Sequence, residues 1–236
     1  MLTYHRFDPK IPGPTTVTIA GLQSQLSYLS DHGFVIVPLN QVVEIVLGHA
    51  RPPSDSLVTI SVDDGHRSVY TVLYPIIERC HIPITLFIYP SAISNSSNAL
   101  TWAELREMQA SGLVEVQSHT YWHPDFRKEK ARRTPADYAV FVDMQLTRSR
   151  AKLDLELGTH VDLLAWPYGI VDDDLEAAAR HAGYRAAFAY DGKLARPGDN
   201  HLAIHRVPVP GTARGASFAA LLLSGTPGKE KDHARE

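Results

Sequence analysis

The sequence predicts an α/β protein built from βα units around a mainly parallel sheet or barrel. Short β-like apolar runs alternate with amphipathic helical stretches along most of the 236 residues. Polar residues with metal-binding chemistry follow directly after two of these apolar runs. Hydrophobic residues make up 44% of the chain, which is enough for one sizeable core. We therefore expect one domain over residues 1–227 and a polar, disordered tail over 228–236.

The apolar pattern predicts the elements of the first half in order. Leu22, Leu26 and Leu29 recur at helical spacing and predict the first helix. Further helices are expected at residues 41–47, before Gly48, and at 69–80. Expected strands cover residues 1–5, 34–37, 57–62 and 84–89.

Two capping patterns predict helix starts in the second half. Thr101 and Glu104 have the spacing of a capping box. Thr134, followed by Pro135 at the first helical position, predicts a long helix through about residue 157. Between them, the basic stretch 121–135 is expected to be a solvated loop, or alternatively a rim that meets a polymeric or anionic ligand. Strands are expected at 113–116, 163–166 and 186–190, and a last helix at 172–182.

Charge and composition exclude several classes of function. The net charge of -3 has no long block of one sign, so nothing indicates binding to nucleic acid or to an anionic membrane. No run approaches the roughly 18 apolar residues of a membrane span, and no basic-then-apolar export signal begins the sequence. The single cysteine, Cys80, excludes an intrachain disulfide, and its helical spacing from Ile76 predicts a buried thiol.

Two polar motifs stand at predicted strand ends. Asp63 and Asp64 close the first apolar run, and His119 and His123 follow the second. Each motif alone is also typical of a turn, a helix start or a core feature. Strands of such folds present their ligands at one shared edge, so together the motifs offer one carboxylate and two imidazoles for a divalent metal. The second carboxylate would serve as a general base, which predicts a metal-assisted hydrolase.

These motifs resemble those of the NodB-homology polysaccharide deacetylases, carbohydrate esterase family 4. Ser-Val-Asp-Asp-Gly at residues 61–65 is similar to their Thr-Phe-Asp-Asp-Gly motif, and His-Thr-Tyr-Trp-His at 119–123 is similar to their His-Ser/Thr-x-x-His motif. The resemblance covers most of the chain. It implies a distorted, NodB-like (β/α) barrel of about seven βα units, with residues 1–227 as the catalytic domain.

The same resemblance assigns roles to the motif residues. The second aspartate, Asp64, would hold a divalent metal together with His119 and His123, and Asp63 would be the general base. Zinc is the default ion for this ligand set, which also suits cobalt, nickel or iron.

A third motif is only partly present. Trp-Pro-Tyr-Gly at residues 166–169 resembles the family's Arg-x-Pro-aromatic motif, in which the backbone amide of the aromatic residue, here Tyr168, helps to bind the oxyanion. The motif's arginine, which orients the base in relatives, has no match, because Leu164 or Ala165 stands in its place. Trp122, Trp166 and Pro167 are the candidates for contact with the sugar. For the two tryptophans a position in the core is an equal alternative.

Two histidines are candidates for the general acid. Leu-Thr-Tyr-His-Arg at residues 2–6 resembles the opening strand of the poly-β-1,6-N-acetylglucosamine deacetylases, a branch in which the family's last motif, Leu-x-His, is circularly permuted to the N-terminus. His5 is therefore the preferred acid. His205 is the nearest candidate in the unpermuted position near the C-terminus.

The resemblance implies removal of N-acetyl groups from an N-acetylglucosamine-containing polysaccharide, with release of acetate. Such a substrate favours an extracytoplasmic location, periplasmic or secreted. Two alternatives stay open: deacetylation of another amide, in peptidoglycan or a chitooligosaccharide, and a non-catalytic carbohydrate-binding relative that keeps the metal. A glycoside hydrolase using Asp63 or Asp64 with Asp125 is disfavoured, because adjacent aspartates do not lie about 5 Å apart across a glycosidic bond.

Overall fold

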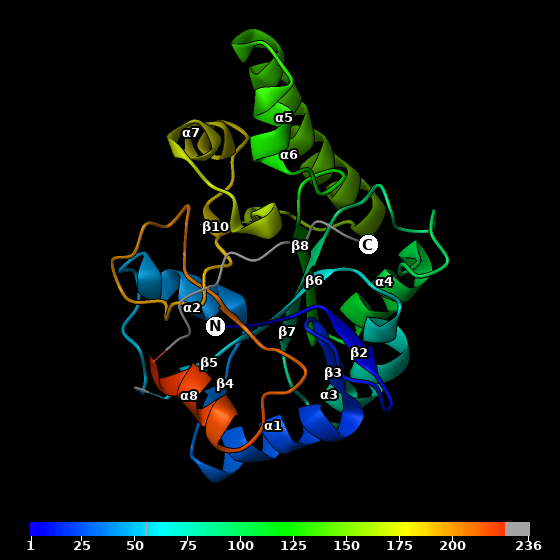
Figure 1. Ribbon diagram of the computed structural model, residues 1–236, viewed down its shortest axis with the longest axis vertical. Coiled ribbons are helices and arrows are strands. Elements are labelled where there is room, and N and C mark those ends of the chain that lie inside the picture. Colours follow the sequence, from blue (N-terminus) through cyan, green and yellow to red (C-terminus); the bar gives the residue numbers. More distant parts are fainter. Residues whose placement is uncertain (55, 225–236) are drawn as a thin grey trace.

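A parallel sheet forms the centre of the protein in a computed structural model that describes residues 1–54 and 56–224. The tail predicted at 228–236 lies outside the described residues. The seven strands run in the order β10-β9-β8-β7-β6-β1-β11, and their pairings are all parallel. Figure 1 shows them surrounded by helices, which confirms the predicted α/β class. The strands are β1 (Leu2–Tyr4), β6 (Ile60–Asp64), β7 (Ile84–Ile88), β8 (Val114–Ser118), β9 (Leu163–Ala165), β10 (Ala186–Phe188) and β11 (Val207–Pro208).

The sheet curls so that one short segment reaches both of its edges. Phe188 of β10 forms a parallel bridge with Ile204. Three residues further on, Val207 of β11 pairs with Leu2 of β1. Residues 204–208 therefore lie beside β10 at one end and beside β1 at the other. The result is the distorted, partly closed barrel that the sequence predicts.

Helices and two small strand pairs cover the sheet. The helices are α1 (Ile19–Asp31), α2 (Leu39–Val46), α3 (Tyr74–Cys80), α4 (Trp102–Ala110), α5 (Phe126–Ala131), α6 (Pro135–Leu157), α7 (Asp173–His181) and α8 (Ala216–Ser224). The strand pairs are β2 (Arg6–Asp8) with β3 (Thr16–Thr18), and β4 (Val35–Ile36) with β5 (Leu57–Val58). None of the described helices is both long and apolar enough to cross a bilayer.

Both capping predictions are confirmed. The Thr101 hydroxyl accepts a hydrogen bond from the Glu104 amide at 3.2 Å, and the Glu104 carboxylate accepts one from the Thr101 amide at 2.7 Å. At the start of α6 the Thr134 hydroxyl accepts the Asp137 amide at 3.2 Å, and the helix ends at Leu157 before the left-handed Gly158. Local side-chain chemistry thus sets both helix starts.

The helix predicted at 69–80 is present, as a π-helical turn, Val69–Leu73, that runs directly into α3. Two other local expectations are wrong. The stretch 121–135 contains the short helix α5. Cys80 is exposed rather than buried, because it is the last residue of α3 and the chain then turns away through the left-handed His81.

Replacing Thr101 tests how much the capping box contributes to stability. In Thr101→Ala the hydroxyl that accepts the Glu104 amide is lost, so we expect the free energy of unfolding to fall by about 1 kcal/mol. Urea unfolding followed by circular dichroism measures this. Thr159→Ala is the control, because the Thr159 hydroxyl makes no hydrogen bond to the described residues. Equal losses in the two variants would contradict the prediction.

Candidate active site

The two aspartates end strand β6 at the carboxyl edge of the sheet. Asp63 and Asp64 pair in register with Phe87 and Ile88 of β7. Successive strand residues normally point to opposite faces. Asp64, however, has a left-handed φ of 77°, which departs from strand geometry. Both carboxylates consequently approach the same ring, His119, whose Nε2 lies 3.9 Å from Asp63 Oδ2 and 3.6 Å from Asp64 Oδ1.

The two histidines lie on a tight loop that follows β8. His119 is anchored by its amide, which donates to the Ile88 carbonyl at 2.8 Å. Thr120 and His123 both adopt left-handed backbone conformations, and the Thr120 hydroxyl accepts the His123 amide at 3.2 Å. This folding brings the two imidazole centroids to 4.6 Å from each other. The four-residue spacing of His119 and His123 therefore brings the two rings together through a loop and not through a helical turn.

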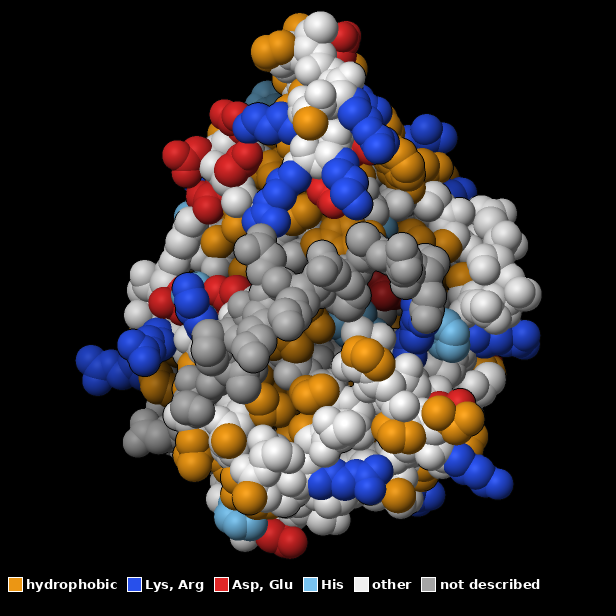
Figure 2. Space-filling model, viewed as in Figure 1, with side chains coloured by type: hydrophobic (Ala, Val, Ile, Leu, Met, Phe, Trp, Pro, Cys, Tyr) orange, Lys and Arg blue, Asp and Glu red, His pale blue; other side chains and the backbone are white. Residues whose placement is uncertain are grey.

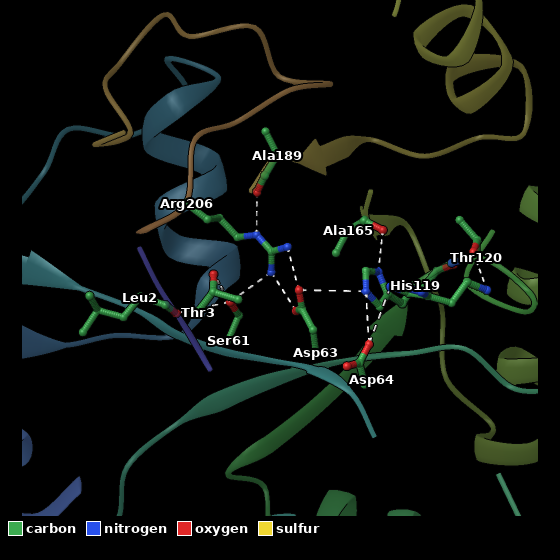
Figure 3. Close-up of polar contacts among 12 residues, drawn as sticks. Leu2, Thr3, Ser61, Asp63, Asp64, His119, Thr120, Ala165, Ala189 and Arg206 are labelled. Atoms are coloured by element: carbon green, nitrogen blue, oxygen red, sulfur yellow. Dashed lines mark hydrogen bonds and ion pairs between the residues drawn. The ribbon is translucent and has the colours of Figure 1, made fainter. Parts of the chain in front are cut away.

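Asp64, His119 and His123 form a cluster that fits a divalent cation. Each imidazole Nε2 lies 3.6 Å from Asp64 Oδ1, and one ligand atom from each residue lies within 4.8 Å of the others. Two ligands bound tetrahedrally at about 2.1 Å from an ion would be about 3.4 Å apart. His119 Nδ1 donates to the Ala165 carbonyl at 2.7 Å, so its Nε2 carries a lone pair toward the carboxylates (Figure 3).

Burial keeps these imidazoles neutral. It lowers the pKa of His119 to about 4, assisted by repulsion from His123. Burial also lowers the pKa of His123 to about 4. Both rings are therefore unprotonated at neutral pH, which is the state in which histidine binds a metal.

Arg206 pairs with Asp63, the candidate base, and so stands where relatives use the arginine that the third motif lacks here. Its side chain is fully buried, and its Nη1 and Nη2 each donate to one oxygen of Asp63 at 2.8 Å. Nε donates to the Ala189 carbonyl at 2.9 Å, and Nη1 also reaches the Ser61 hydroxyl at 3.2 Å (Figure 3). The sequence held one signal for it: an arginine between the apolar residues at 202–204 and 207–209 needs a buried partner.

This pairing fixes the charge of Asp63. Burial alone would raise the pKa of its carboxyl group, but the Arg206 guanidinium and His119 more than offset that effect and lower the pKa to about 2. Asp63 is therefore ionised at neutral pH. Removing one partner of such a buried pair leaves an uncompensated charge.

The two acid candidates have different surroundings. The His5 ring packs edge-on against Tyr190, with centroids 5.4 Å apart. His5 also lowers the pKa of Asp63, although burial, Arg206 and His119 have larger effects. His5 therefore lies near that carboxylate. His205 instead places Nδ1 at 2.7 Å from the Asp191 carboxylate. Among the described residues, no contact joins His205 to either aspartate of β6.

Tyr168 stands beside the histidines in a strained turn. It has a left-handed φ of 57°, and its ring packs against His123 with centroids 4.6 Å apart. Its backbone amide donates to no described group. An amide in this position is available to a ligand, as the resemblance implies.

The three residues predicted to contact the substrate differ in their exposure. Trp166 is fully buried and its indole N–H donates to the Leu202 carbonyl at 2.8 Å, so the prediction that it contacts a sugar is wrong. Pro167 is buried as well and is likewise a packing residue. Trp122 is 46% exposed, with one ring edge on Phe141, and its contact with substrate stays a prediction.

The basic residues near the site are mostly paired with acids. Lys130 lies 3.0 Å from both Asp172 and Asp174, and Glu129 pairs with Arg132 and Arg133. Figure 2 shows blue and red side chains interspersed at this end of the molecule. The described residues therefore form no large patch of one charge sign here.

Comparison with known proteins places the chain in a family. The family model described as polysaccharide deacetylase matches residues 50–187. The poly-β-1,6-N-acetyl-D-glucosamine N-deacetylase of Staphylococcus aureus (strain MRSA252) is 25% identical over 197 residues, which cover 81% of this chain and 67% of that protein. The protein of the same name from Staphylococcus epidermidis is 25% identical over 203 residues, 84% of this chain and 69% of the relative.

Solved structures agree. The structure of IcaB from Ammonifex degensii has a TM-score of 0.83 and 26% identity, covering 94% of this chain and 96% of that one. The deacetylase PplD of Streptococcus pyogenes shares the fold, with a TM-score of 0.81, 20% identity and coverage of 96% and 97%. The resemblance seen in the motifs is thereby confirmed, and the chain belongs to the polysaccharide deacetylase family.

Proposed function

We propose that the protein is a metal-dependent N-deacetylase of an N-acetylglucosamine-containing polysaccharide, with β-1,6-linked chains as the first candidate. The observation that carries this is the convergence of the buried Asp63–Arg206 pair with the cluster of Asp64, His119 and His123. The names of the relatives support the substrate class. Residues 1–227 would be the catalytic unit, and an extracytoplasmic location stays a prediction.

The residues of the cluster would hold the ion. Asp64, His119 and His123 suit zinc, and also cobalt, nickel or iron. When bound, such an ion supplies Lewis acidity, which polarises the acetyl carbonyl and acidifies the attacking water.

Asp63 would take the proton of that water. Arg206 keeps it ionised and fixes the direction of both oxygens, but a carboxylate with a pKa of about 2 is a weak base. It can act on water only where the water is already acidified. The pairing therefore makes Asp63 dependent on the neighbouring cluster.

The remaining groups would act on the developing charges. The free Tyr168 amide would donate to the oxyanion, a contribution typically worth about 3 kcal/mol for one donor. His5 would give a proton to the departing sugar amine, leaving acetate and a free amine as products. Trp122 would provide a face for a sugar ring.

The alternatives differ in what supports them. Deacetylation of peptidoglycan or chitooligosaccharide would use the same residues, and only the loops around the site would differ. A non-catalytic role loses one of its motivations, because Arg206 takes the place of the missing arginine. For a glycoside hydrolase, Asp125 is poorly suited, since it caps α5 by accepting the Lys128 amide at 3.0 Å.

Acetate release tests the proposal directly. Metal-reconstituted protein should release acetate from β-1,6- or β-1,4-linked N-acetylglucosamine oligomers, and a chelated sample should not. Asp63→Asn should keep its metal, measured by elemental analysis, and lose about 10²- to 10⁴-fold in kcat, because the base is gone. Asp125→Asn is the control and should keep most activity. No acetate from metal-loaded protein with either linkage would refute the deacetylase proposal for these substrates.

Arg206→Gln should affect both stability and pH dependence. The variant leaves Asp63 buried without its partner, so the free energy of unfolding should fall by about 3 to 5 kcal/mol. Removing the cation also raises the pKa of Asp63, which moves the acid limb of kcat/KM to higher pH. Urea unfolding and a pH–rate profile measure the two effects. The double variant with Asp63→Asn should regain part of the stability; if it is no more stable than Arg206→Gln alone, the two residues are not coupled.

The neutral histidines predict a stability change in metal-free protein. Below pH 6.5 unfolded histidine binds a proton, whereas folded His119 and His123, with pKa values of about 4, do not. Stability should therefore fall as the pH falls from about 6.5 to about 4, by up to about 3 kcal/mol per histidine. Urea unfolding with chelator at several pH values measures this. A His119→Gln, His123→Gln double variant should show a flatter dependence, and an unchanged slope would contradict the assignment.

A further inference from the structure

A pocket opens beside the cluster of Asp64, His119 and His123 and shares Asp64 with it. It has a volume of about 220 Å³ and is lined chiefly by Arg6, Asp64, His66, Tyr89, Ser96 and Asn98. This space is many times what a single water needs, so the pocket can take a ligand group of several atoms. On the face shown in Figure 2, an acidic side chain lies recessed in a hollow with basic and histidine side chains beside it.

The walls of this pocket are held by backbone pairing. The Leu100 amide donates to the Gly65 carbonyl at 2.9 Å, and the Arg67 amide donates to the Asn98 carbonyl at 2.7 Å. Gly65 has a φ of 79°, and a Cβ there would lie 2.8 Å from Ile88 Cδ1, so only glycine fits. The pocket therefore has a fixed wall next to Asp64.

Arg6 is a cation without a protein partner in this pocket. Strand pairing fixes its backbone, because its amide donates to the Thr15 carbonyl at 3.1 Å and β2 runs beside β3. Its exposed guanidinium makes no hydrogen bond or ion pair within residues 1–54 and 56–224. Arg206 differs, since its guanidinium is fully engaged with Asp63 and its neighbours.

The charge balance of the pocket follows from its lining. Among the described residues that line the pocket, Asp64 is the only acidic one, and the proposed function commits it to a divalent ion. With that ion bound, the positive charge of Arg6 is not balanced by any lining group. Such a pocket accepts hydroxyl and carbonyl oxygens and repels a second cation.

We propose that this pocket receives the sugar residue next to the one being hydrolysed, and that Arg6 selects a neutral, acetylated neighbour over one that carries a free ammonium group. The proposal rests on the proposed function and adds a specificity-determining residue to it. Each turnover creates an ammonium group on the chain. Arg6 would therefore slow reaction beside a finished residue, and the product would carry spaced rather than contiguous free amines.

Defined trisaccharides test this selection. The central residue is N-acetylated, and the flanking residues are either both acetylated or carry one free amine, placed on each side in turn. For one placement, wild-type protein should show a kcat/KM for acetate release that is roughly tenfold lower than for the fully acetylated trisaccharide, at a pH where the amine is protonated. The ratio should shrink as salt is added, because exposed charges are screened.

Variants at Arg6 separate its charge from a structural role. Arg6→Gln should bring the ratio close to one, Arg6→Lys should restore it, and Lys10→Gln, which removes a cation outside the pocket, should leave it unchanged. A ratio in Arg6→Gln equal to wild type, with acetate still released, would overturn this inference and leave the proposed function standing.

A binding measurement keeps the inference independent of turnover. Calorimetry with metal-loaded Asp63→Asn should show weaker binding of the same amine-bearing trisaccharide, and Arg6→Gln in that background should remove the difference. Equal affinities for all the trisaccharides would overturn the inference. Absence of acetate from every trisaccharide in the wild type would instead count against the proposed function.

Discussion

The salt bridge between Arg206 and Asp63 links the candidate active site to the segment that closes the barrel. The two residues are 143 positions apart in the sequence, and both side chains are buried. Removing two charges from water costs several kcal/mol per ion, so the pair is favourable only with near-complete hydrogen bonding. Arg206 provides that through Asp63, Ser61 and the Ala189 carbonyl. Because Arg206 lies on the segment that bridges β10 and β1, Asp63 is held in this position only when the curled sheet has formed.

The candidate site also contains most of the unusual backbone conformations. Within the described residues, six non-glycine residues have positive φ, and four of them, Asp64, Thr120, His123 and Tyr168, belong to the candidate site. Each such conformation typically costs about 1 kcal/mol or more and persists only where the surroundings enforce it. Here the strain directs a carboxylate, two rings and an amide to one place. Regular strand geometry would have pointed neighbouring side chains apart.

Much of the fold and the centre of the site could be predicted from the sequence, because both depend on local signals. Capping residues and periodicity located α4 and α6, and the two polar motifs located Asp64, His119 and His123. The role of Arg206 could not be assigned from the sequence. Its partner Asp63 lies 143 positions away and meets it only when the barrel closes, and no local pattern indicates that contact. The prediction that Trp166 contacts the sugar is wrong for a related reason. The sequence pattern of an aromatic residue in a motif is the same whether its side chain faces the core or a ligand.

The exposed end of α3 has a practical consequence. Cys80 is the single thiol of the chain, is accessible, and lies just before the start of β7. The candidate site lies at the opposite, carboxyl edge of the same sheet. A maleimide dye or a surface linker attached at Cys80 would leave the candidate site open, so immobilised or fluorescent protein can be prepared without engineering a new attachment point.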